Sequence, residues 1–271
     1  MRYALVTGAA RGLGRAFCRA LARDGWCVAV VDIDSAEADE TLRLVKQDGG
    51  TGRVELCDVT DVVAWRAMRT RLQADWTRLD LLVNNAGMFG AGFIAALDLD
   101  AVDRLIRLNL MSVLYGCEVM APWLVESAKV APSPPHIINI ASVFAHYCPP
   151  GMAAYSVSKA GVIALSETLY GELRPRGVGV TVVCPGVMPT RFTERATFDD
   201  ESYRRLTQTY VRESTLSPEA VADAAIAGMR RGNLYAVEGR RERWYWRVKR
   251  MLPQTFLRRV ARRVWRDLKR V

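Results

Sequence analysis

The chain has 271 residues, of which 50% are hydrophobic and 25% charged, and its formal net charge is +9. This balance suits a folded protein with a sizeable core and excludes a disordered polymer, a disulfide-stapled mini-protein and a fibrous repeat. The six cysteines form no Cys-x-x-Cys pair and there are two histidines. We therefore expect no metal site, and the thiols indicate a reduced, cytosolic protein.

The positive charge is concentrated near the C-terminus. Residues 240–271 contain 13 of the 38 basic residues and 2 of the 29 acidic ones, so this segment carries +11 and the remainder −2. The first residues read as a strand and not as a signal peptide, and we find no run of about 20 apolar residues that would predict a membrane span. We expect a nearly neutral, cytoplasmic body with a basic extension.

Along residues 1–239, short apolar runs alternate with longer amphipathic segments. The runs are rich in Val, Ile and Leu, as in strands covered on both faces, and lie at 3–6, 27–31, 53–56, 79–83, 136–140, 178–183 and 234–237. The amphipathic segments lie at 12–24, 35–47, 61–76, 101–127, 154–173 and 217–231, and we expect Ser35, Asp61 and Ser217 to cap three of them. This alternation predicts an α/β fold: a Rossmann-type, doubly wound parallel sheet of about seven strands flanked by helices.

Residues 188–214 follow the sixth predicted strand and have no regular pattern. Long connections at the carboxyl end of a parallel sheet often carry substrate loops, so we interpret this segment as a lid. An ordinary surface connection is the alternative.

A glycine-rich turn follows the first strand, in Thr7–Gly14. Its glycines allow the backbone to approach a pyrophosphate, and the helix that follows offers free N–H groups to that anion; the residues expected to contact the cofactor here are Gly8, Arg11, Gly12, Leu13 and Gly14. Asp32 ends the second strand, where a carboxylate accepts hydrogen bonds from ribose and repels a 2′-phosphate. Arg11 near the phosphates could favour NADP, so both NAD and NADP remain candidate cofactors. Asp32 makes NAD the leading prediction.

Over about residues 1–239, the motifs resemble those of the short-chain dehydrogenase/reductase family. Besides the T-G-x-x-x-G-x-G turn, they comprise Asp58-Val59, Asn84-Asn85-Ala86-Gly87, Asn109, Ser142, Tyr155-x-x-x-Lys159 and Pro185-Gly186-Val187-Met188-Pro189-Thr190. The resemblance implies that Asp58 and Val59 contact adenine and that the cofactor is further held by Asn85, Ala86, Gly87, Tyr155, Lys159, Pro185, Gly186, Met188 and Thr190. It also implies a catalytic set of Asn109, Ser142, Tyr155 and Lys159.

The spacing of Tyr155 and Lys159 suggests acid–base chemistry. Residues four apart share one face of a helix, and a nearby ammonium would lower the phenol's pKa from about 10 and make it usable as a base. In the predicted mechanism Tyr155 takes the proton of an alcohol while hydride leaves for nicotinamide, and reduction reverses both steps. Ser142 would hold the substrate oxygen. By resemblance, Asn109 would hold a water that links Lys159 to solvent.

Aromatic residues near these positions predict an apolar substrate wall. Its expected members are Phe144, Tyr147, Met152, Phe192 and Phe198, and the substrate contacts are predicted to be Ser142, Phe144, Tyr147, Tyr155 and Phe192. His146 is at most part of that wall. A lipophilic alcohol or ketone, such as a steroid, a retinoid or a long-chain alcohol, is the favoured substrate. A 3-oxoacyl-thioester reductase is the alternative enzyme, and a dinucleotide-sensing scaffold is the non-enzymatic one.

In residues 240–271, apolar residues recur at three- and four-residue steps opposite a face of Arg and Lys. This pattern predicts an amphipathic helical extension. An anionic membrane surface is the favoured partner, docking on another subunit or on the protein's own body is the alternative, and nucleic acid is disfavoured because it leaves the apolar stripe unexplained. The resemblance implies a homodimer or a homotetramer.

Overall fold

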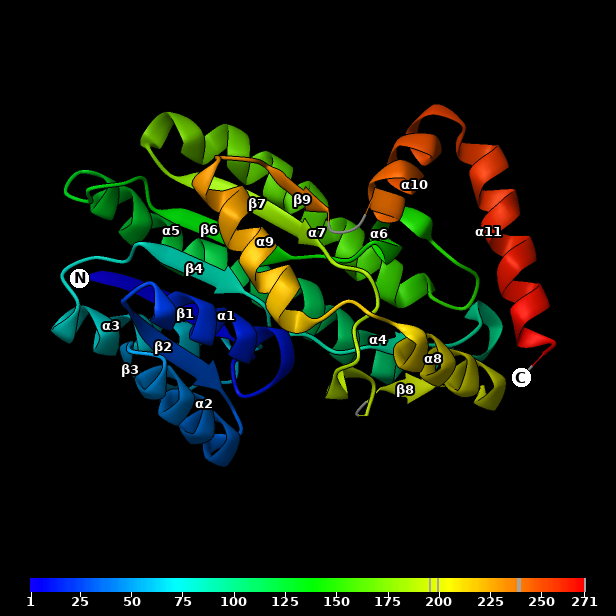
Figure 1. Ribbon diagram of the computed structural model, residues 1–271, viewed down its shortest axis with the longest axis horizontal. Coiled ribbons are helices and arrows are strands. Elements are labelled where there is room, and N and C mark those ends of the chain that lie inside the picture. The colour runs from blue at the N-terminus through cyan, green and yellow to red at the C-terminus, as the bar shows by residue number, and fades with distance from the viewer. Residues whose placement is uncertain (195, 199, 238–239, 271) are drawn as a thin grey trace.

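The computed structural model describes residues 1–194, 196–198, 200–237 and 240–270 (Figure 1). A parallel sheet runs through its centre, with the strand order β3-β2-β1-β4-β6-β7-β9. Its seven strands are β1 (Arg2–Thr7), β2 (Trp26–Asp32), β3 (Thr51–Leu56), β4 (Leu81–Asn84), β6 (His136–Ile140), β7 (Gly179–Cys184) and β9 (Tyr235–Val237). The order reverses direction beside β1, which places the carboxyl ends of β1 and β4 at the switch point where such sheets bind ligands. The predicted sheet is confirmed.

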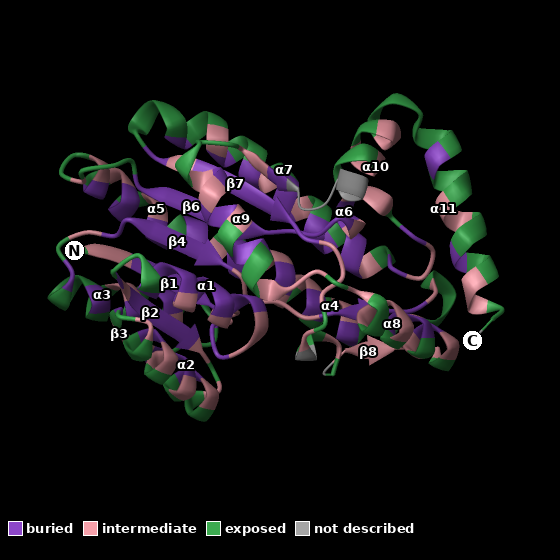
Figure 2. Ribbon diagram, viewed as in Figure 1, coloured by how far each residue is buried: buried purple, intermediate pink, exposed green. Residues whose placement is uncertain are grey.

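Helices cover both faces of this sheet because each contributes an apolar stripe to one of two cores. One core includes Phe17, Ala38 and Val221 and lies beneath α1 (Gly12–Arg23), α2 (Ser35–Gln47) and α9 (Pro218–Arg230). The other includes Trp65 and Met120 and lies beneath α3 (Val62–Asp75), α5 (Ser112–Ala128) and α7 (Ala153–Leu173). Figure 2 shows the central strands β4, β6 and β7 as buried between these layers, whereas only Glu55 is buried in the edge strand β3.

Two of the three predicted helix caps are present. The side chain of Asp61 accepts a hydrogen bond from the N–H of Val63, and Ser217 accepts one from the N–H of Ala220. The prediction for Ser35 is wrong: Asp34 caps α2, and Ser35 is already its first helical residue. A carboxylate one position earlier reaches the free N–H groups of the first turn and also complements the helix dipole.

The predicted helix at 101–127 is longer and interrupted. It runs from α4 (Leu99–Ile106) through a π-helical turn (Arg107–Met111) into α5. By length and composition alone, residues Leu99–Ala128 could cross a membrane, which the sequence analysis did not anticipate. However, 56% of the apolar window is buried inside the protein, as in a core helix.

The sequence predicted no regular structure in residues 188–214, but the structure has regular elements there. It contains β8 (Thr197–Phe198), which pairs with β5 (Gly90–Ala91), and the helix α8 (Glu201–Glu213). Only Tyr203, Leu206 and Thr207 of α8 are buried, so its apolar face is too short for a clear periodic signal.

Residues 240–270 form two helices, α10 (Arg240–Met251) and α11 (Pro253–Leu268), which we call the C-terminal hairpin. The hairpin folds back on the body of the protein: α10 packs against α6 (Phe144–Tyr147) and α11 against α8 (Figure 1). Pro253 begins α11 at a position where its missing N–H costs nothing. The expected boundary between body and extension lies beside residues 238 and 239, outside the described residues.

Candidate active site

The glycine turn is packed tightly against the loop that follows β4. Gly8 has a φ of +60°, and a Cβ added to it would lie 2.8 Å from the Cα of Ala86. A Cβ on Gly14 would overlap the carbonyl oxygen of Gly8. The Nδ2 of Asn85 donates to the carbonyl oxygens of Thr7 (2.8 Å) and Gly8 (3.1 Å) and so ties the two loops together. Side chains at positions 8 and 14 would therefore push the turn away from its neighbours, and only glycine allows this close packing.

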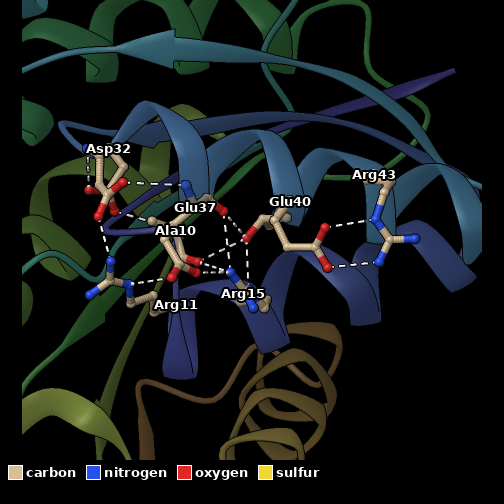
Figure 3. Close-up of polar contacts among 9 residues, drawn as sticks. Ala10, Arg11, Arg15, Asp32, Glu37, Glu40 and Arg43 are labelled. Atoms are coloured by element: carbon tan, nitrogen blue, oxygen red, sulfur yellow. Dashed lines mark hydrogen bonds and ion pairs between the residues drawn. The ribbon is translucent and has the colours of Figure 1, made fainter.

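Asp32 lies at the end of β2 beside this turn (Figure 3). Its carboxylate accepts hydrogen bonds from the backbone N–H groups of Ala10 (3.0 Å), Ile33 (2.8 Å) and Asp34 (3.2 Å). Arg11, which could have favoured a 2′-phosphate, is instead paired with the carboxylate of Asp34 at 2.5 Å, and its Nε lies 3.4 Å from Glu37. The positive charge of Arg11 is thus largely neutralised, and negative charge dominates this corner.

Three of the four predicted catalytic side chains lie at the carboxyl end of β6 and the first turns of α7. Ser142, Tyr155 and Lys159 are 4%, 5% and 3% exposed. The Nζ of Lys159 donates to the carbonyl oxygen of Ile140 at 2.9 Å, and the Oγ of Ser142 accepts from the N–H of Phe144 at 3.2 Å. The hydroxyl of Ser142 also acts to lower the pKa of Tyr155.

Burial governs the electrostatics of this group. It raises the pKa of Tyr155 to about 12, against the smaller opposing effect of the Ser142 hydrogen bond, and it lowers the pKa of Lys159 to about 8. The expectation that Lys159 lowers the pKa of Tyr155 is therefore wrong for this arrangement. The reason is that both groups are desolvated and the ammonium donates to a backbone carbonyl.

Asn109, the fourth predicted catalytic residue, lies in the π-helical turn and is fully buried. Its Oδ1 accepts from the N–H of Met88 at 2.7 Å, and its Nδ2 donates to the carbonyl of Met88 at 2.9 Å and to the hydroxyl of Ser158 at 3.2 Å. A Cβ on Gly87 would lie 3.0 Å from the Oδ1 of Asn109 and 3.5 Å from the Nζ of Lys159. Asn109 thus joins the loop after β4 to α7. It lies in a π-helical turn, a feature that is frequent at functional sites.

A cavity of about 1240 Å³ connects the glycine turn to these side chains. Every residue predicted to contact cofactor or substrate lines it, with the exception of Gly14. Among the other predictions, Met152 lines it, whereas Asn109, Phe198 and His146 do not. The pKa of His146 is lowered to about 4, chiefly by burial, so this imidazole is neutral at physiological pH.

The sequence analysis missed two groups of lining residues. From α8 come Tyr203, Leu206, Thr207, Tyr210 and Val211, and from the C-terminal hairpin come Trp244, Tyr245, Val248, Leu252, Thr255, Phe256, Arg259, Val260, Arg263 and Val264. The sequence showed that Phe256, Val260 and Val264 share one apolar face of a helix. It did not show which surface of the protein that face covers.

A family model described as short chain dehydrogenase matches residues 2–201. The chain belongs to this family. Probable oxidoreductase EphD of Mycobacterium tuberculosis is 32% identical over 273 residues; that alignment covers 95% of this chain but only 44% of EphD, so the chain spans less than half of this relative's length.

Two solved family members show the same fold and contain a nicotinamide cofactor. A short chain dehydrogenase/reductase from Burkholderia phymatum in complex with NAD has a TM-score of 0.86, with 26% identity and 94% of each chain covered. A short-chain dehydrogenase from Sphingobium yanoikuyae in complex with NADPH has a TM-score of 0.78, with 27% identity and 95% of each chain covered. Family membership and these two complexes confirm the prediction of NAD(P) as the cofactor. The tight glycine turn and the carboxylate of Asp32 fit such a dinucleotide.

Proposed function

We propose that this chain is an NAD-preferring oxidoreductase that interconverts an alcohol and a carbonyl compound of lipophilic character. One observation carries the proposal: a single cavity joins the dinucleotide turn, the hydroxyls of Tyr155 and Ser142, and a chamber with aromatic walls. A protein that only sensed a dinucleotide would have no use for a phenol and a hydroxyl buried at the junction of the two halves.

Tyr155 is the proposed general acid and base. With a pKa raised to about 12 it is protonated at neutral pH, so it donates a proton to the oxygen of a carbonyl substrate, while Ser142 holds that oxygen by a second hydrogen bond. When bound, the nicotinamide supplies or accepts the hydride. In the direction of oxidation Tyr155 takes the proton of the alcohol in its phenolate form, which the hydroxyl of Ser142 favours.

Lys159 and Asn109 are proposed as positioning residues. Lys159 would orient the nicotinamide ribose. Asn109 makes two hydrogen bonds to Met88 in the loop after β4 and one to Ser158 in α7. It would therefore fix the position of Gly87 relative to Lys159. Asp58, Val59 and the segment 185–190 would enclose the two ends of the cofactor, because they line the same cavity.

The preference for NAD rests on charge. A 2′-phosphate on the adenosine ribose would meet Asp32 and Asp34, and the arginine that could compensate is already paired with Asp34. Carboxylates accept hydrogen bonds from the free ribose hydroxyls of NAD without this repulsion.

A spectrophotometric assay at about 340 nm, where reduced nicotinamide absorbs, tests this function. We expect turnover to increase with chain length across a series of secondary alcohols and ketones, and to be faster with NAD(H) than with NADP(H). Replacing Tyr155 with Phe should abolish turnover without loss of NAD binding. The matched control Tyr170→Phe, on the same helix but outside the cavity, should leave it unchanged. Normal turnover by Y155F would refute the assignment, and turnover confined to 3-oxoacyl thioesters would replace the substrate class.

We also propose that the C-terminal hairpin, as an extension of the 1–239 domain, contacts an anionic membrane on the cytoplasmic side. Met251 is 80% exposed and Leu252 58% at the turn of a strongly basic segment, and Trp244, nearer the start of α10, is 55% exposed. Apolar side chains among cations suit the interface of an anionic bilayer. Flotation with phosphatidylserine vesicles should recover the full chain, and M251D/L252D should lower that recovery; an unchanged recovery would contradict the proposal. A homodimer or homotetramer remains a prediction, which sedimentation analysis tests.

A further inference from the structure

The C-terminal hairpin forms the outer wall of the substrate half of the cavity. The ring of Tyr147, at the end of α6, has its centroid 5.7 Å from those of both Tyr245 and Phe256. Trp265 stacks on Phe93 with centroids 5.1 Å apart and an interplanar angle of 9°. Aromatic contacts therefore hold both helices of the hairpin against the body of the protein.

Two arginines interrupt the apolar character of this wall. Arg259 and Arg263 both line the cavity and are one turn apart on α11, so they lie on the same side of the helix. Arg258 and Arg262 belong to the same helix and do not line the cavity. The cavity thus meets two guanidinium groups at its outer end.

These two arginines are not neutralised alike. Among the described residues, Arg259 has no ion-pair partner. The Nε of Arg263 lies 3.5 Å from Asp267, which also accepts a hydrogen bond from the hydroxyl of Tyr210 at 2.9 Å. Asp267 is also paired with Arg266 at 3.4 Å, so its single negative charge is shared and a net positive charge remains at this end of the cavity.

The acidic residues that line the cavity belong to other regions. Asp32, Asp34 and Asp58 lie at the ends of strands β2 and β3, around the adenosine end. Glu213 immediately precedes Ser214, whose hydroxyl donates to the carbonyl of Val187 in the loop expected to flank nicotinamide. Glu194 lies in the segment between β7 and α8. Within the described lining of the cavity, the hairpin thus contributes two basic residues and no acidic residue.

We propose that Arg259 and Arg263 form an anion subsite, and that the substrate is an amphipathic molecule with a carboxylate or phosphate group far from its reacting carbon. The proposal rests on the function assigned above, because it takes the reacting oxygen to lie at Tyr155. The apolar part of the substrate then lies along Tyr147, Phe256 and Val260. Its anionic group emerges between the two guanidinium groups.

The arrangement is physically reasonable for such a ligand. Arg259 is exposed and the side chain of Arg263 is 49% exposed, so an anion bound here keeps part of its hydration and avoids the cost of burying a charge. Guanidinium groups bind carboxylates and phosphates through paired hydrogen bonds. The apolar walls supply affinity, and the arginines set orientation.

Binding of a fluorescent fatty acid tests the subsite without any need for turnover. The probes are 11-(dansylamino)undecanoic acid and its methyl ester, added to the NAD-loaded full-length protein and followed by energy transfer from tryptophan, since Trp244 lines the cavity. The wild-type protein should bind the acid more tightly than the ester, and salt should weaken binding of the acid alone. R259Q/R263Q should raise the Kd of the acid by about tenfold and leave that of the ester unchanged.

The control R258Q/R262Q removes the same charge from the same helix and should leave both affinities unchanged. Thermal unfolding and NAD binding establish that all variants are folded. An equal loss for the two arginine pairs, an equal loss for acid and ester, equal wild-type affinity for both probes, or no binding of the acid would each overturn the subsite. Y155F should bind the acid normally, so failure of the proposed catalytic function would be seen separately, as turnover retained by that variant.

Discussion

Replacing Lys159 with Met should make the protein's stability less dependent on pH. Burial lowers the pKa of Lys159 from 10.5 to about 8, so at pH 7 the folded state holds an ammonium whose burial costs about 3 kcal/mol. Between those two pKa values the unfolded chain binds more protons at this lysine than the folded chain does, so stability rises with pH across that window. Methionine removes this contribution. It also leaves the carbonyl of Ile140 without its partner, which costs about 1–3 kcal/mol, so K159M should match or exceed the wild-type stability at pH 7.

Urea unfolding of the cofactor-free protein, followed by tryptophan fluorescence at pH 7 and pH 9, measures this effect. The difference in unfolding free energy between K159M and wild type should fall by about 1.3 kcal/mol from pH 7 to pH 9. Y155F is the control: the pKa of Tyr155 is about 12 in the folded state and 10 ordinarily, both above the window, so its difference from wild type should not vary. A K159M difference that is the same at both pH values would refute the reasoning.

Three further substitutions follow from the geometry. Asp32→Ala should shift the preference between NADP and NAD toward NADP by about tenfold or more in steady-state kinetics, and an unaltered ratio would exclude Asp32 as the discriminating charge. In the urea unfolding assay, Gly14→Ala should destabilise the protein by more than about 2 kcal/mol, because its Cβ meets a backbone oxygen, and it should impair NAD binding. The control Gly171→Ala is exposed in α7 with open space around it, so it should stabilise the protein by about 0.5–1 kcal/mol. Phe256→Ala should weaken docking of the hairpin by about 3 kcal/mol and speed proteolysis within residues 240–270, because the ring is buried against the body. The neighbouring Leu257 is 37% exposed, so Leu257→Ala should do neither. Equal cleavage of the two variants would contradict the docking contacts.

Much of the sheet and its surrounding helices could be predicted because their signals are local. The apolar runs of most strands are short and continuous, as expected for strands covered on both faces, although the edge strand β3 contains Arg53 and Glu55. The glycine turn needs only its own neighbours to be recognised. Signals were weaker where an element buries little. The helix α8 escaped notice because few of its side chains are buried.

The amino-acid sequence alone determined the fold class and the position of the glycine turn, and it predicted the residues proposed for the catalytic centre, because periodicity and motif spacing are properties of the chain itself. Only the tertiary structure decided the pKa values of Tyr155 and Lys159 and the surface covered by the hairpin. Desolvation depends on what packs around a group, and an amphipathic helix shows that it must cover an apolar surface without showing which one. The substrate wall, with its two arginines, is formed by α6 and the C-terminal hairpin, which are about a hundred residues apart in sequence, and it exists only when they are packed together.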